Sequence, residues 1–363
     1  MTLKIVEEGL AKVRIDDVFY NLRMKFCRDL DMLLFRNLKQ HRHKHEYLDA
    51  LAASGIRGIR AALEANYQPI LNDRDVKAVE VIKQNLKLNN VDADVYNKDA
   101  SLLMRERRFY HIDLDPFGSP SEFIDSACYS ALKYLSITAT DTAALCGSAT
   151  NSGLRKYSAF AKKTEYYPEV GVRILIGKVA REITKYDRAF EVMLCWAKEH
   201  YYRIHLKVIK STSRAGKLYN NVGYLYHCFD CLNRMWLPMN GKTKEICECG
   251  SKFTMIGPLW IGELHKQELI SKMLDDLSIK SSETEKTIEF LKRIENEIDA
   301  PFYYDIHAIS QRLKVAPPQI NKIISKLEDE GFKASKTRFS SISFKTDARI
   351  EDVKNVILKL STS

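Results

Sequence analysis

Four short apolar segments with polar or acidic ends constrain the fold of this chain more than any other feature. The segments begin near residues 47, 69, 95 and 109, and each is followed by a stretch with helical character. Strands that alternate with helices favour an α/β fold with a doubly wound sheet. Because ligands bind at the carboxyl ends of the strands in such sheets, polar residues at four successive ends predict one ligand along the rim.

The fourth expected strand ends in the corner Asp113-Leu114-Asp115-Pro116-Phe117-Gly118-Ser119-Pro120. A carboxylate can hold an amine, Pro116 fixes the direction of its carbonyl, and Phe117 offers a face on which a planar base can stack. The combination suits methylation of an exocyclic amine, although Pro, Gly and Ser also form ordinary surface turns. Alternation points Asp113 and Asp115 to the same side, so either carboxylate could be nearer to the chemistry.

The first two expected strands also lead into features that suit a nucleotide-like ligand. The first runs into a small-residue turn and a helix, and Gly55 and Gly58 let the backbone approach a ligand closely. The turn lacks the full G-x-G-x-x-G spacing of dinucleotide folds. The second strand ends at Asp73, which is placed to accept ribose hydroxyls.

A helix is expected over residues 24–38, with Arg28 and Asp29 as an ion pair on its surface.

The segments after the corner are expected to complete the sheet. Residues 135–142 supply a fifth strand, and residues 172–198 form a long, largely helical region. Residues 203–209 alternate strictly, with residues 222–226 as their antiparallel partner. The sheet should therefore end in an antiparallel edge hairpin.

Four of the eight cysteines lie close together in the sequence. Cys228 and Cys231 form one pair, and Cys247 and Cys249 form a second pair with one residue between them. Two such pairs around a short β-like insertion predict a ribbon that surrounds zinc tetrahedrally. Four thiolates leave no open position on the metal, so the zinc would be structural. The alternative is a cluster of reduced, partly buried thiols.

The C-terminal part of the chain is rich in charged helices. A short helix over residues 305–313, a turn through 316–318, a second helix from 320 and an alternating stretch over 333–345 predict a winged-helix-like module. A small packing domain with an ordinary basic face is the alternative. Six basic residues would be available to phosphates: Lys322, Lys326, Lys333, Lys336, Arg338 and Lys345.

The length and charge of the chain bound its class. Its 363 residues suit two or three domains, and a formal charge of +10 with a pI near 9.0 favours a polyanionic partner. Residues 1–8 lack an apolar leader, and no run approaches the ~20 apolar residues of a membrane span. We therefore expect a cytoplasmic protein with no membrane association and no obligate protein partner.

The strand ends together resemble a class I S-adenosylmethionine-dependent methyltransferase, and longer strings resemble the tRNA guanine-26 dimethyltransferase family. The matching strings extend from residue 18 to residue 260. They are Val18-Phe19-Tyr20-Asn21 with Arg28-Asp29, Ala53-Ser54-Gly55-Ile56-Arg57-Gly58-Ile59-Arg60, Asn72-Asp73, Asp99-Ala100, residues 113–120, Thr138-Ala139-Thr140-Asp141-Thr142-Ala143-Ala144-Leu145-Cys146-Gly147 and Gly257-Pro258-Leu259-Trp260.

The resemblance implies two methyl transfers from S-adenosyl-L-methionine to the exocyclic amine of a guanine at the junction of the D-stem and anticodon stem of tRNA. It implies catalytic roles for Asp115, Asp113, Pro116 and Phe117, with Asp115 nearest to the chemistry. The cofactor-binding residues would be Arg28, Asp49, Gly55, Arg57, Asp73, Asp99 and Ala100.

This chain departs from the family in its second cysteine pair. The family usually has two residues between these cysteines, whereas only Glu248 separates Cys247 from Cys249 here.

The expected organisation has four parts. Residues 1–45 would be an N-terminal extension that packs on the catalytic domain, and residues 46–226 the methyltransferase domain. Residues 227–262 would be the zinc-ribbon-like segment, and residues 263–363 a tRNA-binding domain. Two other functions stay open: an amino-methyltransferase that acts on DNA or another RNA, and a non-catalytic regulator built on a retired methyltransferase fold.

Overall fold

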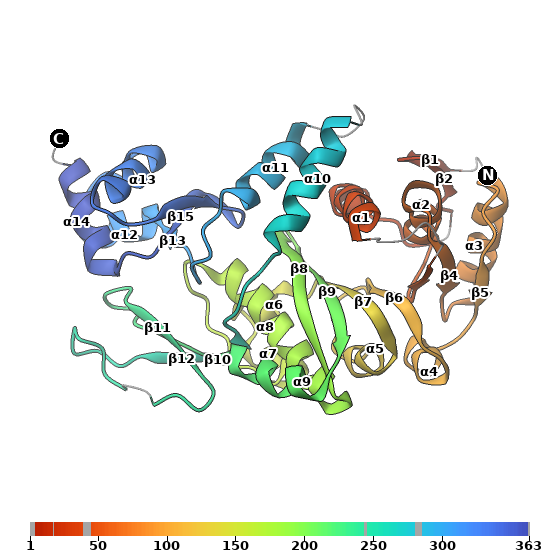
Figure 1. Cartoon of the computed structure of the whole chain (residues 1–363), viewed down its shortest axis with the longest axis horizontal. Helices are drawn as coiled ribbons and strands as arrows, with labels where there is room; N and C mark the ends of the chain where they lie inside the picture. Colours follow the sequence, from red (N-terminus) through yellow and green to blue (C-terminus); the bar gives the residue numbers. More distant parts are fainter. Residues whose placement is uncertain (1–3, 17, 39–44, 243–244, 280–284, 362–363) are drawn as a thin grey trace.

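The computed structural model describes residues 4–16, 18–38, 45–242, 245–279 and 285–361. A central sheet with helices on both faces is followed along the chain by a three-stranded ribbon and a smaller α/β unit, and Figure 1 shows these last two at the end opposite the N-terminus. No helix among the described residues has both the length and the apolar composition that crossing a membrane would require.

The central sheet has seven strands in the order β5-β4-β3-β6-β7-β9-β8. The first five in this order are parallel, and the last two form an antiparallel hairpin at one edge. The predicted α/β fold with a doubly wound sheet and an antiparallel edge hairpin is confirmed. The strands are β3 (Glu46–Asp49), β4 (Gln68–Asn72), β5 (Asp94–Tyr96), β6 (Phe109–Leu114), β7 (Ala131–Ala139), β8 (Arg188–Lys198) and β9 (Tyr201–Lys210).

The helices cover the two faces of this sheet because successive side chains of a strand point to opposite sides. In β6, Ile112 and Leu114 join the core formed with α4, α5 and α8, whereas the ring of His111 packs against Phe35 of α1. Figure 1 shows α1 and α2 above the sheet and α4, α5 and α8 below it. The helices are α1 (Lys25–Leu38), α2 (Ile56–Ala65), α3 (Val76–Leu88), α4 (Ala100–Glu106), α5 (Ile124–Ser130), α6 (Thr142–Cys146), α7 (Thr150–Tyr157), α8 (Tyr167–Ile183) and α9 (Thr212–Leu218).

The edge hairpin is formed by a different pair of segments from the pair that the sequence predicts. The region 172–198 is helical only in its first part, because α8 ends at Ile183, a 3-10 helix covers Thr184–Tyr186, and β8 begins at Arg188. The chain turns at Asp187, whose φ of 53° is left-handed, and no glycine or proline marks this position in the sequence. The partner of β9 is therefore β8, and the predicted pairing of residues 203–209 with 222–226 is wrong.

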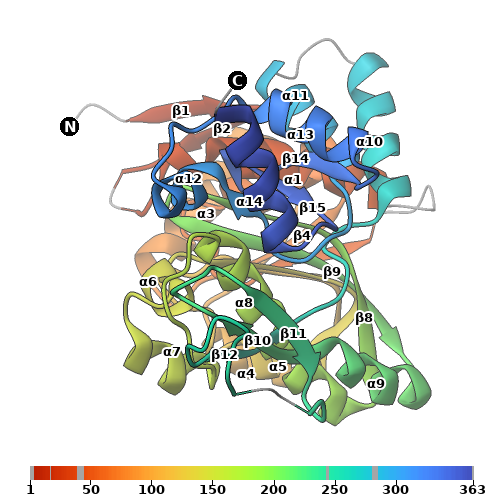
Figure 2. The ribbon, with the colours of Figure 1, turned by 90° about the vertical axis from the view of Figure 1, so that its left-hand side faces the viewer.

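Residues 222–226 belong instead to the ribbon. Strand β10 (Val222–His227) lies between β11 (Arg234–Pro238) and β12 (Thr254–Trp260) in an antiparallel sheet. The cysteine pairs lie in the segments that join these strands, at the end of the sheet where β10 ends. Figure 2 shows this ribbon on the side of the molecule that carries α7 and α8.

The C-terminal unit has the predicted order of helix, turn, helix and wing. Its antiparallel sheet has the order β13-β15-β14, and a preceding pair of helices, α10 and α11, packs against α1. The elements are α10 (Gln267–Ile279), α11 (Glu285–Glu295), β13 (Tyr304–Asp305), α12 (Ile306–Leu313), α13 (Ile320–Asp329), β14 (Ala334–Thr337), β15 (Ser340–Thr346) and α14 (Ile350–Ser361).

Two of the basic residues predicted to be available to phosphates are buried instead. Arg338 Nε donates to Glu297 at 2.6 Å, and Lys345 Nζ lies 3.0 Å from Glu297 and 3.3 Å from Glu169 of α8. Arg338 also donates to the carbonyl of Cys195 in β8. These cations therefore fix the wing on the central sheet domain, which the alternation of the wing sequence did not indicate.

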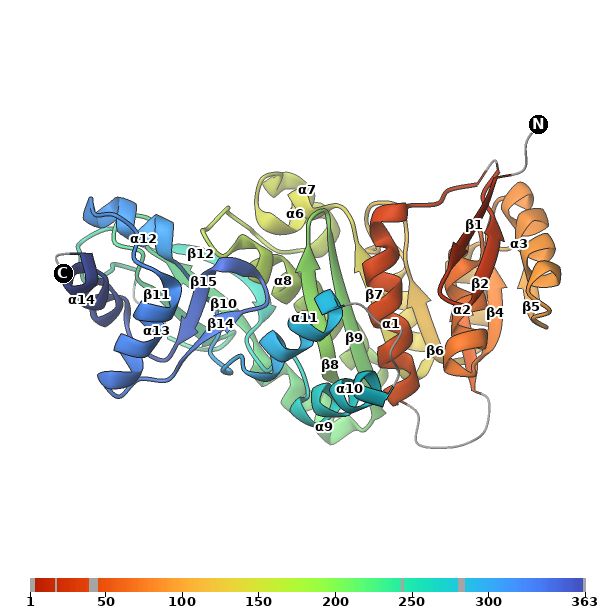
Figure 3. The ribbon, with the colours of Figure 1, turned by 90° about the horizontal axis from the view of Figure 1, so that it is seen from above.

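A hairpin of β1 (Ile5–Glu8) and β2 (Ala11–Arg14) packs on the opposite end of the sheet, beside α2 and α3 (Figure 3). Ala11 and Val13 are buried there with Ile59 and Ile82. The 3-10 helix Leu22–Met24 then leads into α1. The hairpin thus brings Glu8 into contact with Arg28 of α1 and Arg60 of α2.

Candidate active site

A cavity of about 130 Å³ lies at the carboxyl ends of β3 and β6. It brings together Arg28, Asp49 and Arg57 with the corner Asp115-Pro116-Phe117. Six of the eleven residues predicted to be catalytic or to bind the cofactor thus line one cavity. The remaining residues that line it are Phe19, Tyr20, Asn21, Met24, Leu51, Ala52, Ala53, Ser54, Ile56, Thr140 and His200.

The two candidate carboxylates of the corner lie in different surroundings. Asp113 is fully buried and accepts hydrogen bonds from Arg203 Nη1 and the Tyr47 hydroxyl, both at 2.7 Å. Burial would raise the pKa of Asp113, but Arg203 and Arg57 outweigh burial and hold this pKa below its ordinary value. Asp115 follows the end of β6, lines the cavity, and keeps 23% of its side chain exposed. Only Asp115 therefore faces a ligand.

Two aromatic rings stand exposed at the mouth of the cavity. Phe117 is 89% exposed and Phe19 is 59% exposed, and their ring centroids lie 5.8 Å apart in an edge-to-face arrangement. Adjacent exposed rings beside a cavity form the kind of apolar patch that marks a ligand-binding groove. The sequence indicated Phe117 as a stacking residue, whereas Phe19 occurred in a matching string without an assigned role.

The corner is held by the end of the neighbouring strand β7. Gly118 N donates to Thr140 Oγ1 at 2.7 Å, and Thr140 N donates to the carbonyl of Gly118 at 2.9 Å. Gly118 has a φ of 89°, which only glycine adopts without strain. These bonds fix the direction in which Phe117 projects. Sequence reasoning recognised the string around Thr140 but did not identify this contact.

Arg28 is held by a buried carboxylate from the N-terminal hairpin. Its Nε and Nη2 donate to the two Glu8 oxygens at 2.7 and 2.6 Å, and Arg60 and the Tyr20 hydroxyl also donate to Glu8. Burial would raise the pKa of Glu8, but the bonds and charge of Arg28, followed by Arg60, lower it to about 2. Arg28 is therefore not the surface ion pair with Asp29 that the sequence suggested, and Glu8 was missed.

Arg57 lies among three carboxylates. It forms ion pairs with Asp31 of α1 and with Asp115, and its Nε is 3.8 Å from Asp113. Asp31 is also paired with Arg203 Nη2 at 2.9 Å. Because Arg57 and its other partners are buried, the ion pair with Arg57 holds the Asp115 carboxylate in place at the wall of the cavity. Nothing in the local pattern of α1 distinguishes Asp31 from an ordinary surface acid.

Asp49 is a buried carboxyl at the end of β3. Burial raises its pKa to about 7, with Asp113 acting in the same direction and Arg57 opposing it. Gly58 N donates to Asp49 Oδ2 at 3.2 Å. A side chain at position 58 would collide with Leu71, so α2 packs closely on β4 and presents its backbone to Asp49. A cation in this cavity would stabilise the charged form of Asp49.

The other predicted cofactor residues lie along the rim but do not line this cavity. Gly55 is the N-cap of α2 with a φ of 77°, and Asp73 Oδ2 accepts a hydrogen bond from Ala53 N at 2.9 Å. Asp99 caps α4 through Ser101 N and Leu102 N, and Ala100 is buried behind it. These residues follow β3, β4 and β5 in order, so they surround a ligand only if it extends along the sheet edge.

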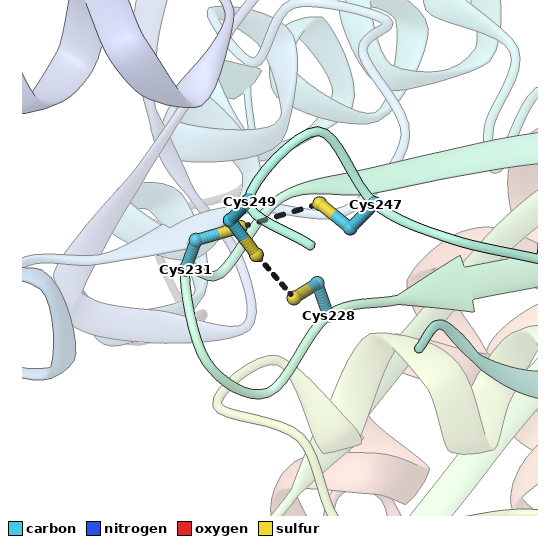
Figure 4. Close-up of side chains that lie close together, drawn as sticks. All are labelled: Cys228, Cys231, Cys247 and Cys249. Atoms are coloured by element: carbon cyan, nitrogen blue, oxygen red, sulfur yellow. Dashed lines mark hydrogen bonds between the residues drawn. The ribbon is translucent and has the colours of Figure 1, made fainter. Parts of the chain in front are cut away.

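The four ribbon cysteines converge despite the short spacing of the second pair (Figure 4). Their sulfur atoms all lie within 4.8 Å of one another. Cys228 Sγ lies 3.5 Å from Cys249 Sγ, and Cys231 Sγ lies 3.5 Å from Cys247 Sγ. A tetrahedral zinc with bonds of ~2.3 Å requires sulfur atoms ~3.8 Å apart, so the four thiolates fit the metal.

We expect one zinc ion per chain in the purified protein, measured by inductively coupled plasma mass spectrometry. Replacement of Cys231 by serine should lower the metal content well below one, because serine is a poor zinc ligand. Cys128 is buried in α5, outside the cluster of four cysteines, and its alanine variant is the matched control. A Cys231→Ser protein that keeps its full metal content would contradict this assignment.

The sheet order and the cavity at the strand ends define a class I methyltransferase. A family model described as N2,N2-dimethylguanosine tRNA methyltransferase matches residues 2–358. The chain therefore belongs to this tRNA methyltransferase family, and the resemblance seen in the sequence is confirmed.

Individual relatives agree with the family assignment. A tRNA (guanine(26)-N(2))-dimethyltransferase of Archaeoglobus fulgidus is 49% identical, with 99% of this chain and 98% of the relative aligned. An enzyme of the same name from Methanospirillum hungatei is 38% identical over 94% of this chain and 91% of its own. The structure of Trm1 from Pyrococcus horikoshii in complex with S-adenosyl-L-methionine is 36% identical, with a TM-score of 0.89 over 98% of this chain and all of that one.

Proposed function

We propose that this protein transfers two methyl groups from S-adenosyl-L-methionine to the exocyclic amine of guanine 26 in tRNA. The observation that carries the proposal is the corner at Asp115, whose carboxylate, adjacent proline and exposed phenylalanine face one cavity at the strand ends. Relatives with the corresponding name align with nearly the whole chain, which supports the same substrate.

S-adenosyl-L-methionine supplies an electrophilic methyl group on a sulfonium, so the protein has to position the amine and manage charge. We propose that Arg28, Asp49 and Arg57 surround the cofactor in the cavity, and that Gly55 and the strand ends at Asp73, Asp99 and Ala100 hold it along the rim. Arg28 and Arg57 are already paired with carboxylates, so their main task there is to fix the walls of the site.

The guanine enters from the side of the two exposed rings. A base in folded RNA must leave its stack at a cost of a few kcal/mol, and stacking on aromatic side chains recovers part of this cost. Phe117 and Phe19 project beside Asp115, so a base that stacks on them has its edge at the carboxylate. This arrangement selects planar nucleobases with an amine on the edge that points inward.

The amine is activated by hydrogen-bond acceptors. Asp115 and the carbonyl of Pro116 accept N–H bonds from it, which favours a more pyramidal and more nucleophilic nitrogen. Asp115 then takes the proton released when the new N–C bond forms. The second transfer repeats this step with a second S-adenosyl-L-methionine, after Asp115 has passed its proton to water, because the monomethylated amine retains one N–H for the carboxylate. Asp113 acts on the chemistry indirectly, through Arg203 and Arg57, which share its network.

The remaining parts of the chain have supporting roles in this proposal. The C-terminal unit carries exposed Lys322, Lys333 and Lys336, which are free to approach tRNA phosphates, whereas its buried Arg338 and Lys345 set its orientation. We propose that the enzyme works in the cytoplasm, where its tRNA substrate is found, and that it needs no obligate protein partner.

The function is tested by incubating the purified protein with unmodified tRNA and labelled S-adenosyl-L-methionine, followed by mass spectrometry of the nucleosides. Dimethylguanosine is expected, and a tRNA with adenine in place of guanine 26 should give none. Label in both tRNAs, or in DNA, would favour an amino-methyltransferase with another substrate. Absence of cofactor binding would favour the non-catalytic regulator.

Replacement of Phe117 by alanine should raise KM for tRNA by roughly five- to 150-fold, because the stacking of one base is worth ~1–3 kcal/mol. Phe117 is exposed, so the fold should be unaffected. Calorimetry should find the same affinity for S-adenosyl-L-methionine, and Phe117→Tyr should restore KM. An unchanged KM in the alanine variant would remove Phe117 from the base-binding site.

A further inference from the structure

A second hollow, of about 410 Å³, lies beside the active-site cavity. It is enclosed by α6, the start of α8, the turn between β8 and β9, and Phe339 at the tip of the wing. The two hollows share two loops: Thr140 and His200 line the active-site cavity, whereas Thr142 and Glu199 line the second hollow. A strand of RNA with one base in the first hollow therefore has the second within reach of a neighbouring nucleotide.

The walls of this hollow combine aromatic faces with cations. Tyr167 is 36% exposed and Phe339 is half-buried, and both rings reach the hollow. Lys163 Nζ lies 5.1 Å from the centroid of the Tyr167 ring, and no ion pair of Lys163 with another described residue is found. Lys198 adds a second cation, whose Nζ also lies 3.4 Å from the centroid of the Phe26 ring, and Glu199 is the single acid of the lining. Proteins that bind single-stranded nucleic acid combine cations with aromatic rings in this way.

We propose that this hollow binds the nucleotide next to the target guanine, and we name it the flanking-nucleotide site. It is defined by Tyr167, Lys163, Lys198 and Phe339. The inference rests on the proposed function. Removing a base from its stack leaves its neighbour with one exposed face, and Tyr167 offers a ring to cover that face while Lys163 contacts the phosphate.

The wing contributes to this site in an unusual way. Its Arg338 is buried against Glu297 and the carbonyl of Cys195, so the tip of the wing is fixed on the central domain and not directed at solvent. Phe339 thereby becomes a wall of the hollow and stacks on Tyr303 with ring centroids 6.1 Å apart. The C-terminal unit thus completes the flanking-nucleotide site as well as supplying an outer basic face.

The test is steady-state methylation of unmodified tRNA by the full chain. Tyr167→Ala should raise KM for tRNA by about five- to 150-fold with an unchanged affinity for S-adenosyl-L-methionine, and Tyr167→Phe should restore KM. Lys163→Gln should reduce the slope of log Kd for tRNA against log salt concentration by about 0.7 to 0.9, the value for one lost phosphate contact. A merely structural role would not change this slope.

Tyr219→Ala and Lys217→Gln are matched controls, because they are an exposed tyrosine and lysine beyond the opposite end of the β8–β9 hairpin. Both should keep wild-type KM and salt dependence. The inference is overturned if Tyr167→Ala keeps KM within about twofold, or if Tyr167→Phe is as impaired as Tyr167→Ala. Formation of dimethylguanosine by the wild-type protein in the same assay reports separately on the proposed function.

Discussion

Asp115→Asn is expected to reduce methyl transfer by roughly 10²- to 10⁴-fold, the usual contribution of a positioned general base. Asparagine retains the shape of the side chain and can still accept a hydrogen bond from Arg57. It cannot take the proton that the amine releases. The affinity for S-adenosyl-L-methionine should stay near the wild-type value, which calorimetry measures, while single-turnover methylation of tRNA measures the chemical step.

Asp113→Asn is the informative comparison for this prediction. Asp113 is bound to Arg203 and Tyr47 in the interior, so its loss should reduce stability together with activity. The expected pattern is a folded, cofactor-binding Asp115 variant without activity. Normal activity in Asp115→Asn, with a loss confined to Asp113→Asn in folded protein, would exchange the two roles and refute the assignment.

Glu8→Gln is expected to destabilise the protein by about 3–5 kcal/mol at neutral pH, because removing one partner of a buried ion pair leaves the other charge uncompensated. Arg28 would keep the carbonyl of Asn21 and the face of the Tyr20 ring, neither of which carries a full negative charge, whereas Arg60 retains Asp29 and Glu64. Since Arg28 and Tyr20 line the cavity, the affinity for S-adenosyl-L-methionine should also fall.

The stabilisation by Glu8 should depend on pH. The pKa of Glu8 is lowered to about 2 in the folded chain, from an ordinary value of 4.5. The contribution of the Glu8 charge is therefore complete above pH 4.5 and is lost as the pH falls toward 2. Urea unfolding should show a large difference between Glu8→Gln and the wild type at pH 7 and a smaller one at pH 3.

Glu7→Gln is the control for this series, because Glu7 is exposed in the same strand and its one ion pair within the described ranges is with Lys12 at the surface. Its effect should stay within about 0.5 kcal/mol, as is usual for exposed substitutions. Equal stability of the Glu7 and Glu8 variants at pH 7 would contradict the view that Glu8 holds the walls of the cavity.

The strand ends could be predicted from the sequence because their signals are local. An apolar run that ends in an acid, followed by a helical period, is complete within about 20 residues, and β3, β4, β5 and β6 were all recognised in this way. The spacing of the two cysteine pairs is also a local signal, and it predicts the ribbon. Local signals also predict the corner at Asp115, where proline and glycine define the turn directly.

The buried charge networks could not be predicted because their members lie far apart in the chain. Glu8 and Arg60 are separated by 52 residues, and Asp31 and Arg203 by 172. No local pattern shows that a charged side chain will be buried against such a partner. The end of α8 is hidden for a local reason, because Asp187 adopts a left-handed conformation that neither glycine nor proline signals, and the sequence therefore predicts helix where β8 lies.

The most direct test of the central claim is a crystal structure of the protein with unmodified tRNA and a non-reactive analogue of S-adenosyl-L-methionine. We expect the amine of guanine 26 within ~3 Å of the Asp115 carboxylate or the Pro116 carbonyl, with its nitrogen facing the position of the sulfonium methyl group. A guanine amine held elsewhere, with Asp115 directed only at Arg57, would contradict it.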